Sequence, residues 1–143
     1  MPHVVAGKHL PKQLHGFGAA LQHSMGVHIT RATRKSIHGE LPVTPLILNR
    51  NNRANGGALM AYADCLGAAG AVMNLPEGYW TTTLESKTNF FVAGVGPVLK
   101  AVSKGLHVGR TTMVWETTIR NSADNSRVAV ITQTQMVIPK RKE

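Results

Sequence analysis

Residues 55–73 read NGGALMAYADCLGAAGAVM and form the longest helical pattern in the chain. The apolar residues of this stretch recur at helical intervals, namely at Ala58, Ala61, Tyr62, Cys65, Ala68, Ala69 and Val72. Further apolar side chains fill the other faces, and a helix that is apolar on every side is buried on every side. Asn55 is a favourable N-cap, and residues 74–78 (NLPEG) end the helix. The stretch therefore predicts one long buried helix at the centre of the fold.

Outside this helix the sequence reads mostly as strands. Before it, residues 27–33 alternate with period two, and residues 36–41 continue that strand as far as Pro42. After it, four extended runs follow, at residues 81–92, 97–103, 111–120 and 127–138. Strands on both sides of one long helix predict an α+β fold in which an antiparallel sheet wraps around that helix.

A chain of 143 residues suits one domain. We place this domain at residues 25–138, after an N-terminal arm or short helix at residues 1–24 and before a basic tail at residues 139–143. The single cysteine, Cys65, excludes a disulfide framework and indicates a reducing, cytoplasmic location. Neither a secretory signal nor a membrane span is predicted, because the longest apolar stretch, residues 56–73, is mostly Gly and Ala and carries Asp64. The histidines show no metal-binding spacing, so we expect no metal site.

The chain is strongly basic, with 16 Lys and Arg against 7 Asp and Glu and a formal charge of +9. This balance favours an anionic partner such as a phosphorylated small molecule or a nucleic acid. Aromatic residues make up only 5% of the chain, and no nucleic-acid-binding motif is present. The basic residues flank a nearly uncharged middle segment, a pattern that suits a basic rim around an apolar slot. We therefore expect no nucleic-acid partner.

Asp64 is the residue that is hardest to explain by structure alone. It lies inside a helix whose other residues are apolar, and buried carboxylates are rare unless they are paired. One interpretation is structural: Asp64 faces a subunit or sheet edge and accepts a hydrogen bond from a Ser or Thr there. The other is catalytic: Asp64 is a general base or a nucleophile in a cleft that holds little water.

The segment Asn55-Gly56-Gly57 supplies a complementary group. The free N–H groups and the positive dipole end of a helix N-terminus favour an oxygen that carries negative charge, and glycine lets a substrate approach closely. Such donors form oxyanion holes. Two glycines by themselves also fit plain tight packing, but a carboxylate on the same helix makes a catalytic pair of roles plausible.

With Asn49–Asp64 (NRNNRANGGALMAYAD), Thr83-Leu84-Glu85 and Asn89-Phe90-Phe91, the sequence resembles the hotdog-fold acyl-CoA thioesterases, in particular the phenylacetyl-CoA thioesterase branch. The turn Gly109-Arg110-Thr111 continues the likeness, which covers about residues 25–138. The family usually has a histidine where this chain has Asn55. The resemblance implies a hotdog fold and hydrolysis of an acyl-CoA, with coenzyme A as part of the substrate and no further cofactor. It also implies a homodimer or a dimer of dimers with the active site between subunits.

The resemblance also implies roles for single residues. Gly56 is the backbone donor to the thioester oxygen, Asp64 the catalytic acid, Thr83 the hydroxyl that orients water or the carboxylate, and Asn49 the polar group near the leaving sulfur. The implied substrate contacts are Asn55, Gly57, Asn89, Phe90, His107, Gly109, Arg110 and Thr111, of which the last four residues meet the coenzyme A tail. Three alternatives stay open: a non-catalytic acyl-CoA-binding module, a nucleic-acid-binding module and a hotdog dehydratase.

Overall fold

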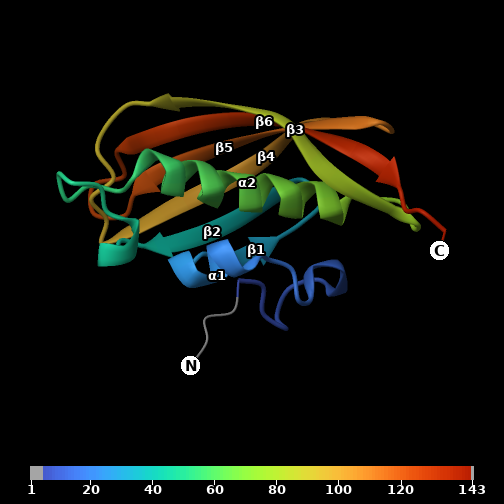
Figure 1. Ribbon diagram of the computed structural model, residues 1–143, viewed down its shortest axis with the longest axis horizontal. Coiled ribbons are helices and arrows are strands. Elements are labelled where there is room, and N and C mark those ends of the chain that lie inside the picture. Colours follow the sequence, from blue (N-terminus) through green and yellow to red (C-terminus); the bar gives the residue numbers. More distant parts are fainter. Residues whose placement is uncertain (1–4, 143) are drawn as a thin grey trace.

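The computed structural model describes residues 5–142 and shows one antiparallel sheet curled around one long helix (Figure 1). In chain order the elements are η1 (Lys12–Leu14), α1 (Ala20–Met25), β1 (His28–Ala32), β2 (Ser36–Pro42), η2 (Pro45–Ile47), α2 (Gly56–Met73), β3 (Tyr79–Phe90), β4 (Val98–Val108), β5 (Thr112–Asn121) and β6 (Arg127–Pro139). The strand order is β1-β2-β4-β5-β6-β3. The predicted α+β class, with the sheet wrapped around the helix, is confirmed.

Helix α2 begins and ends where the sequence predicts. Asn55 has an extended backbone and accepts a hydrogen bond from the Gly57 N–H through its side chain at 2.8 Å, which is the N-cap geometry. At the other end, Asn74 leaves the helical conformation. By length and composition α2 is the one helix within residues 5–142 that could cross a membrane, but here it is the core helix, packed against the sheet.

Two glycines let α2 lie very close to the sheet. A Cβ atom on Gly67 would lie 2.3 Å from Cδ of Gln133, and one on Gly70 would lie 2.5 Å from the ring of Trp115. Both partners are fully buried, Gln133 on β6 and Trp115 on β5. The contact face of the helix therefore has no room for side chains at these two positions.

The segment before α2 differs from the expectation. Residues 27–33 and 36–41 do not form one continuous strand, because they pair with each other as the antiparallel hairpin β1–β2. The Thr33 hydroxyl oxygen accepts hydrogen bonds from the Lys35 and Ser36 N–H groups and thereby fixes the turn. Strand β4 also extends to Val108, beyond the predicted end at residue 103.

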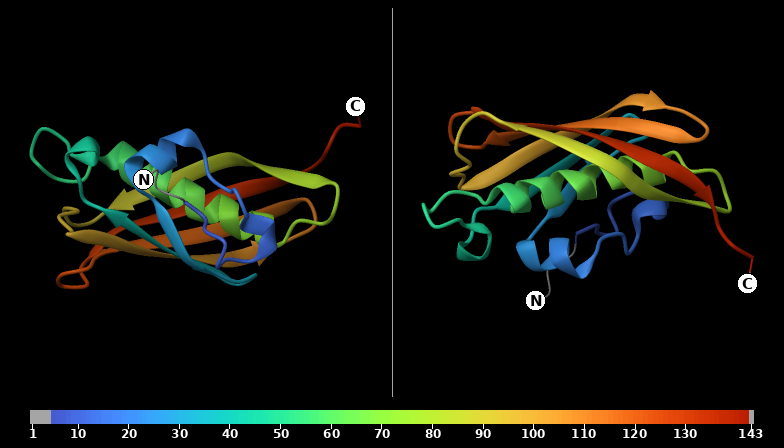
Figure 2. Two further views of the ribbon diagram at one scale, coloured as in Figure 1. Left: turned by 90° about the horizontal axis from the view of Figure 1, so that it is seen from below. Right: turned by 45° about the horizontal axis from the view of Figure 1, so that its top comes forward.

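The N-terminal segment is packed onto the core. Val5, Leu10 and Leu14 are buried, and α1 and the residues before it lie on the side of α2 opposite β3, β5 and β6 (Figure 2). Helix α1 crosses the boundary that the sequence places at residue 24. The buried face of α2 is thus covered by the sheet on one side and partly by this segment on the other.

Strand β3 lies at the edge of the sheet and pairs only with β6 within the described residues. Its apolar side chains are unusually exposed: Trp80 is 54% exposed, Leu84 55% and Phe90 54%. A long, exposed edge strand is a surface on which another strand can pair.

The close contact of α2 with β5 makes a testable prediction. We expect Gly70→Ala to lower the free energy of unfolding by about 1–3 kcal/mol through overpacking against Trp115, a cost that the roughly 1 kcal/mol better helix propensity of alanine offsets only in part. Chemical denaturation measures the change, and Met60→Ala, at an exposed position of the same helix, is the control. Equal or higher stability of Gly70→Ala would show that the helix has room to move.

Candidate functional site

The Asp64 carboxylate accepts hydrogen bonds from donors on the sheet. The Thr83 hydroxyl on β3 donates to Asp64 Oδ1 at 2.8 Å, and Gln133 Nε2 on β6 donates to the same oxygen at 3.4 Å. No hydrogen bond to Oδ2 forms within residues 5–142. Asp64 therefore has the Thr partner that the structural interpretation expects, and it keeps one free oxygen that the catalytic interpretation needs.

A bulge in β3 orients Thr83. The pairing of β3 with β6 shifts between Thr83 and Glu85, so that Thr83 opposes Gln135 whereas Ser86 opposes Gln133. Gln133 and Gln135 are both fully buried on the face that meets α2. A bulge inserts one residue and re-aims the side chains beside it, and here the inserted residue is the exposed Leu84. The bulge thus lets Thr83 and Ser86 both lie opposite glutamines that face the helix.

A cavity of about 720 Å³ opens beside Asp64. Its lining residues come from the N-terminal segment, α2 and β3, namely Phe17, Gly18, Ala19, Gln22, Asp64, Cys65, Ala68 and Trp80. Gln22 on α1 donates through Nε2 to the Ala61 carbonyl at 3.4 Å, and its buried Oε1 has no hydrogen-bond partner within the described residues. The cavity is mostly apolar around one carboxylate and one amide.

Two N–H groups at the start of α2, those of Gly56 and Ala58, have no acceptor within residues 5–142. The Gly57 N–H, in contrast, is taken by the Asn55 side chain. The ring of Phe90 lies against Gly56, 3.1 Å from where a Cβ atom would be. Gly56, Phe90 and Asn49 line a groove of about 350 Å³ together with Arg53, Ala54, Leu59, Phe91, Val92, Ala93 and Gly94.

The side chain of Asn49 has a structural task in this groove. Its Oδ1 accepts hydrogen bonds from the N–H groups of Asn51 at 2.9 Å and Arg53 at 3.1 Å. Asn49 thereby holds the loop that leads into α2. Its amide nitrogen makes no hydrogen bond within the described residues.

The predicted site residues fall into separate groups within one chain. Asp64 and Thr83 are in contact, and Asn49, Gly56 and Phe90 share a groove. Eight residues separate Gly56 from Asp64 on one helix, which is about 12 Å along the axis at about 1.5 Å per residue. One carbonyl group therefore cannot contact both groups of the same chain.

The remaining predicted contacts lie farther away. Gly109, Arg110 and Thr111 form the tip of the β4–β5 hairpin, and His107, next to a bulge in β4, packs over Gly109. This hairpin lies near the first residues of β3, since Thr82 and Thr112 both pair with Met136. Gly56 lies at the opposite end of β3, beside Phe90.

The side chains of Asn89 and Phe90 point to opposite faces of the sheet. It pairs with Val130 of β6, which in turn pairs with Thr118 on the outer face of the sheet. Because successive strand residues point to opposite faces, Asn89 faces away from α2. The structure does not bring it to either group of site residues within one chain.

Sequence reasoning missed three glutamines near Asp64, namely Gln22, Gln133 and Gln135. The last two could have been found, because they occupy positions of the final strand that face the core, in line with Ile131 and Val137. Amides at core positions need a polar partner. Gln22 carried no such signal, since its segment showed no clear periodicity.

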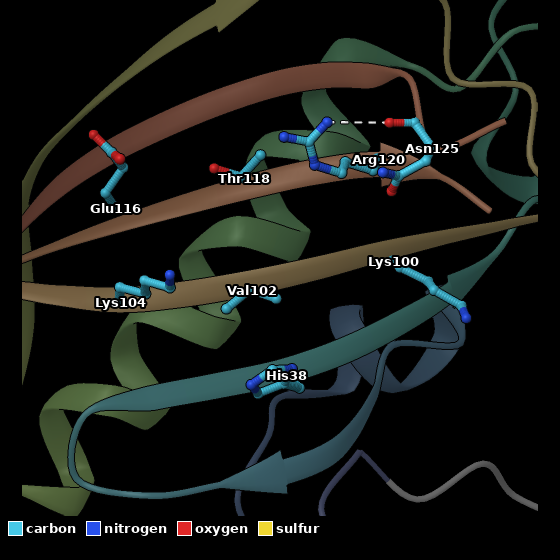
Figure 3. Close-up of a pocket in the computed structure, with 8 residues that line it drawn as sticks. All are labelled: His38, Lys100, Val102, Lys104, Glu116, Thr118, Arg120 and Asn125. Atoms are coloured by element: carbon cyan, nitrogen blue, oxygen red, sulfur yellow. Dashed lines mark hydrogen bonds between the residues drawn. The ribbon is translucent and has the colours of Figure 1, made fainter.

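A separate groove of about 670 Å³ crosses β2, β4 and β5 on the outer face of the sheet (Figure 3). Its lining residues are His38, Lys100, Val102, Lys104, Glu116, Thr118, Arg120 and Asn125. Burial, followed by the charges of Arg31 and Lys104, lowers the pKa of His38. No Phe, Tyr or Trp side chain lines the groove, so it lacks the stacking platform typical of single-stranded nucleic-acid binding. These basic residues do not surround the Asp64 cavity within one chain.

Comparison with known proteins relates this geometry to one family. The sequence pattern of the thioesterase superfamily matches residues 51–127. A 1,4-dihydroxy-2-naphthoyl-CoA hydrolase of Listeria monocytogenes is 20% identical over 123 residues, which are 86% of this chain and 98% of that protein.

Solved structures show the same fold. A thioesterase of Haemophilus influenzae is 21% identical, with a TM-score of 0.83 and a coverage of 90% of both chains. The PaaI protein from the phenylacetic acid degradation operon of E. coli is also 21% identical, with a TM-score of 0.81 over 90% of this chain and 93% of that chain. These likenesses confirm the predicted hotdog fold and the resemblance on which it rested.

The surroundings of Cys65 predict its reactivity. Burial and, to a smaller degree, the charge of Asp64 raise the pKa of the Cys65 thiol to about 12, and only the thiolate reacts readily. We expect a disulfide reagent at about pH 8 to label no thiol in the native protein and one per chain after denaturation. Rapid labelling of the native protein would contradict this placement of Cys65.

Proposed function

Because the chain belongs to the thioesterase superfamily, and thioester hydrolysis is therefore its class of chemistry, we propose that it cleaves an acyl-CoA to the free acid and coenzyme A. The observation that carries this proposal is that the Gly56 N–H and one oxygen of the Asp64 carboxylate, both on α2, are free of hydrogen-bond partners within the described residues. The Gly56 N–H lies at the positive end of the helix, and the Asp64 carboxylate is held by Thr83. A donor for an oxyanion and a base or nucleophile are the two groups that acyl transfer requires.

The proposed reaction uses both groups on one carbonyl. The Gly56 N–H, strengthened by the helix dipole, donates to the thioester oxygen and stabilises the negative charge that develops there. Asp64 removes a proton from a water molecule whose oxygen bonds to the carbonyl carbon, or Asp64 attacks that carbon itself. The carbon–sulfur bond then breaks, and the sulfur of coenzyme A leaves and takes up a proton.

The separation of Gly56 from Asp64 supports a site that two copies of the chain share. The strand β3 has twelve residues, a length of about 35 Å or more. It is an edge strand without a second partner strand within the described residues, and it exposes the apolar side chains of Trp80, Leu84 and Phe90. Antiparallel pairing of β3 with β3 of a second copy would place the Phe90 end of one strand, with its Gly56, beside the Tyr79 end of the other. We therefore propose a homodimer at least.

The same pairing supports a role for the β4–β5 hairpin. Arg110 lies near the Tyr79 end of β3, so pairing brings it toward Gly56 of the second copy. A positive side chain there suits the phosphates of coenzyme A. The name of the Listeria relative, a hydrolase of a coenzyme A thioester, is in line with such a substrate. The single, buried cysteine fits a reducing compartment, and we place the protein in the cytoplasm.

Release of free thiol from acyl-CoAs tests the proposed function. We expect Asp64→Asn to keep the fold and to lower kcat by about two orders of magnitude or more, because the base or nucleophile is lost. The matched control is Asp124→Asn, which removes a carboxylate that is bound to Ser126 in an exposed turn and should leave kcat unchanged. Turnover of Asp64→Asn within a few fold of wild type would refute the assignment, and a wild type that releases no thiol from short, long or aromatic acyl-CoAs would refute the function.

The first residue of α2 allows the backbone donor itself to be removed. We expect Gly56→Pro, which has no N–H, to lower kcat by about 10²- to 10³-fold, the usual loss for one oxyanion donor. Proline is tolerated at the first helical position, and Asn55 already has the extended backbone that precedes proline. Gly56→Ala, which keeps the N–H and adds a Cβ atom near Phe90, is the matched control and should keep more activity than the proline variant.

Mixing the two inactive variants tests whether the site is shared. In a heterodimer of Gly56→Pro and Asp64→Asn, one of the two sites has an intact Gly56 from one chain and an intact Asp64 from the other. After subunit exchange we therefore expect about a quarter of wild-type activity. Activity that stays at the level of the separate variants, although exchange is shown by mass, would mean that both groups act within one chain.

A further inference from the structure

The Thr83 hydroxyl belongs to a chain of side-chain hydrogen bonds that runs beneath α2. Thr83 donates to Asp64 Oδ1 at 2.8 Å, and Gln135 Nε2 donates to the Thr83 oxygen at 2.7 Å. At its far end, the Thr81 hydroxyl lies 3.0 Å from Gln135 Oε1. Gln135 is fully buried, so its amide has no access to solvent. We refer to Thr81, Gln135, Thr83 and Asp64 as the hydrogen-bond chain.

The chemistry of its members fixes the direction of every bond in this chain. An ionised carboxylate can only accept, so the one hydroxyl proton of Thr83 points to Asp64. The Thr83 oxygen can then only accept from Gln135, and this requirement turns the Gln135 NH₂ group toward Thr83. Gln135 Oε1 must therefore face Thr81, whose one hydroxyl proton lies within reach of both Gln135 Oε1 and the Met136 carbonyl, each at 3.0 Å.

We propose that Gln135 is a positioning residue for catalysis, which holds the Thr83 proton on Asp64 Oδ1 and so leaves Oδ2 as the reacting oxygen. The proposal rests on the proposed function. Gln133 supports the same outcome, because its Nε2 also donates to Oδ1. Because Thr83 and Gln133 both donate to Oδ1, the plane of the Asp64 carboxylate is fixed. Oδ2 is then free for water or the carbonyl carbon.

The packing around the hydrogen-bond chain fits this role. Gln133 reaches Asp64 only because Gly67 leaves space for its amide, and Thr83 faces the helix beside the β3 bulge. Another buried pair on the sheet, Thr117 and Ser103, bonds at 2.9 Å without any link to Asp64 within the described residues. Polar side chains that served stability alone could pair with each other as Thr117 and Ser103 do. The hydrogen-bond chain instead ends on the one carboxylate of α2.

A double-mutant cycle with Thr83→Val and Gln135→Met tests the proposal. Both substitutions roughly keep side-chain volume and remove a link. We expect Gln135→Met to lower kcat for an acyl-CoA by about ten- to a hundredfold with KM within about twofold, because a loosened carboxylate loses orientation and not substrate binding. If Gln135 acts through Thr83, adding Gln135→Met to Thr83→Val should lower kcat no further.

Two variants separate positioning from stability. Gln135→Met tests positioning, because it removes the donor to the Thr83 oxygen. Thr117→Val, which breaks the Thr117–Ser103 bond, should lower the unfolding midpoint but leave kcat unchanged.

The possible outcomes are distinct. An active wild type in which the losses of Thr83→Val and Gln135→Met multiply, or in which Gln135→Met keeps full kcat, would overturn the role of Gln135 and leave the proposed function standing. A wild type that hydrolyses no acyl-CoA would overturn the proposed function and the role of Gln135 together. Loss of kcat in Gln135→Met, with no further loss in the double variant and normal kcat in Thr117→Val, is the result that we expect.

Discussion

The need to supply hydrogen-bond donors to one carboxylate on an apolar helix explains much of this structure. Asp64 is the only acidic residue of α2, and a carboxylate in such surroundings is costly unless donors meet it. Thr83 and Gln133 are those donors, and both come from the sheet beneath the helix. The bulge in β3, the amides at core positions of β6 and the glycine at position 67 are otherwise unfavourable choices. Each becomes reasonable as a means to bring a donor to Asp64.

The sequence predicted the elements whose signal is local. The periodicity of residues 55–73 and the cap at Asn55 gave the bounds of α2, because burial on all sides and capping act within one helix. The hairpin β1–β2 was missed, since its turn at residues 33–35 depends on the Thr33 side chain rather than on glycine or proline. Gln133 and Gln135 were missed for a different reason: their partners lie far away in sequence, on α2 and β3.

The candidate site was predictable as a set of residues but not as an arrangement. A linear sequence shows that Gly56 and Asp64 share a helix, and the rise of that helix then separates them by about 12 Å. It does not show that β3 is an exposed edge strand, which depends on the strand order of the folded sheet. On the proposed function, these two facts belong together. If Gly56 and Asp64 of one α2 are too far apart to act on one carbonyl, a second copy of α2 must supply one of the two groups. Pairing along β3, which has a free edge within the described residues, can bring that second copy close.

Asn55 departs from the usual pattern of the family without disturbing the start of α2. The family usually has histidine there, but Asn is among the strongest N-cap residues, and its side chain takes the Gly57 N–H. Occupation of that N–H leaves the Gly56 N–H as the first free donor of the helix. This donor lies beside Phe90 at the positive end of the helix dipole. Asn55 thus keeps the start of α2 in place, and on the proposed function the Gly56 N–H remains available to the oxyanion.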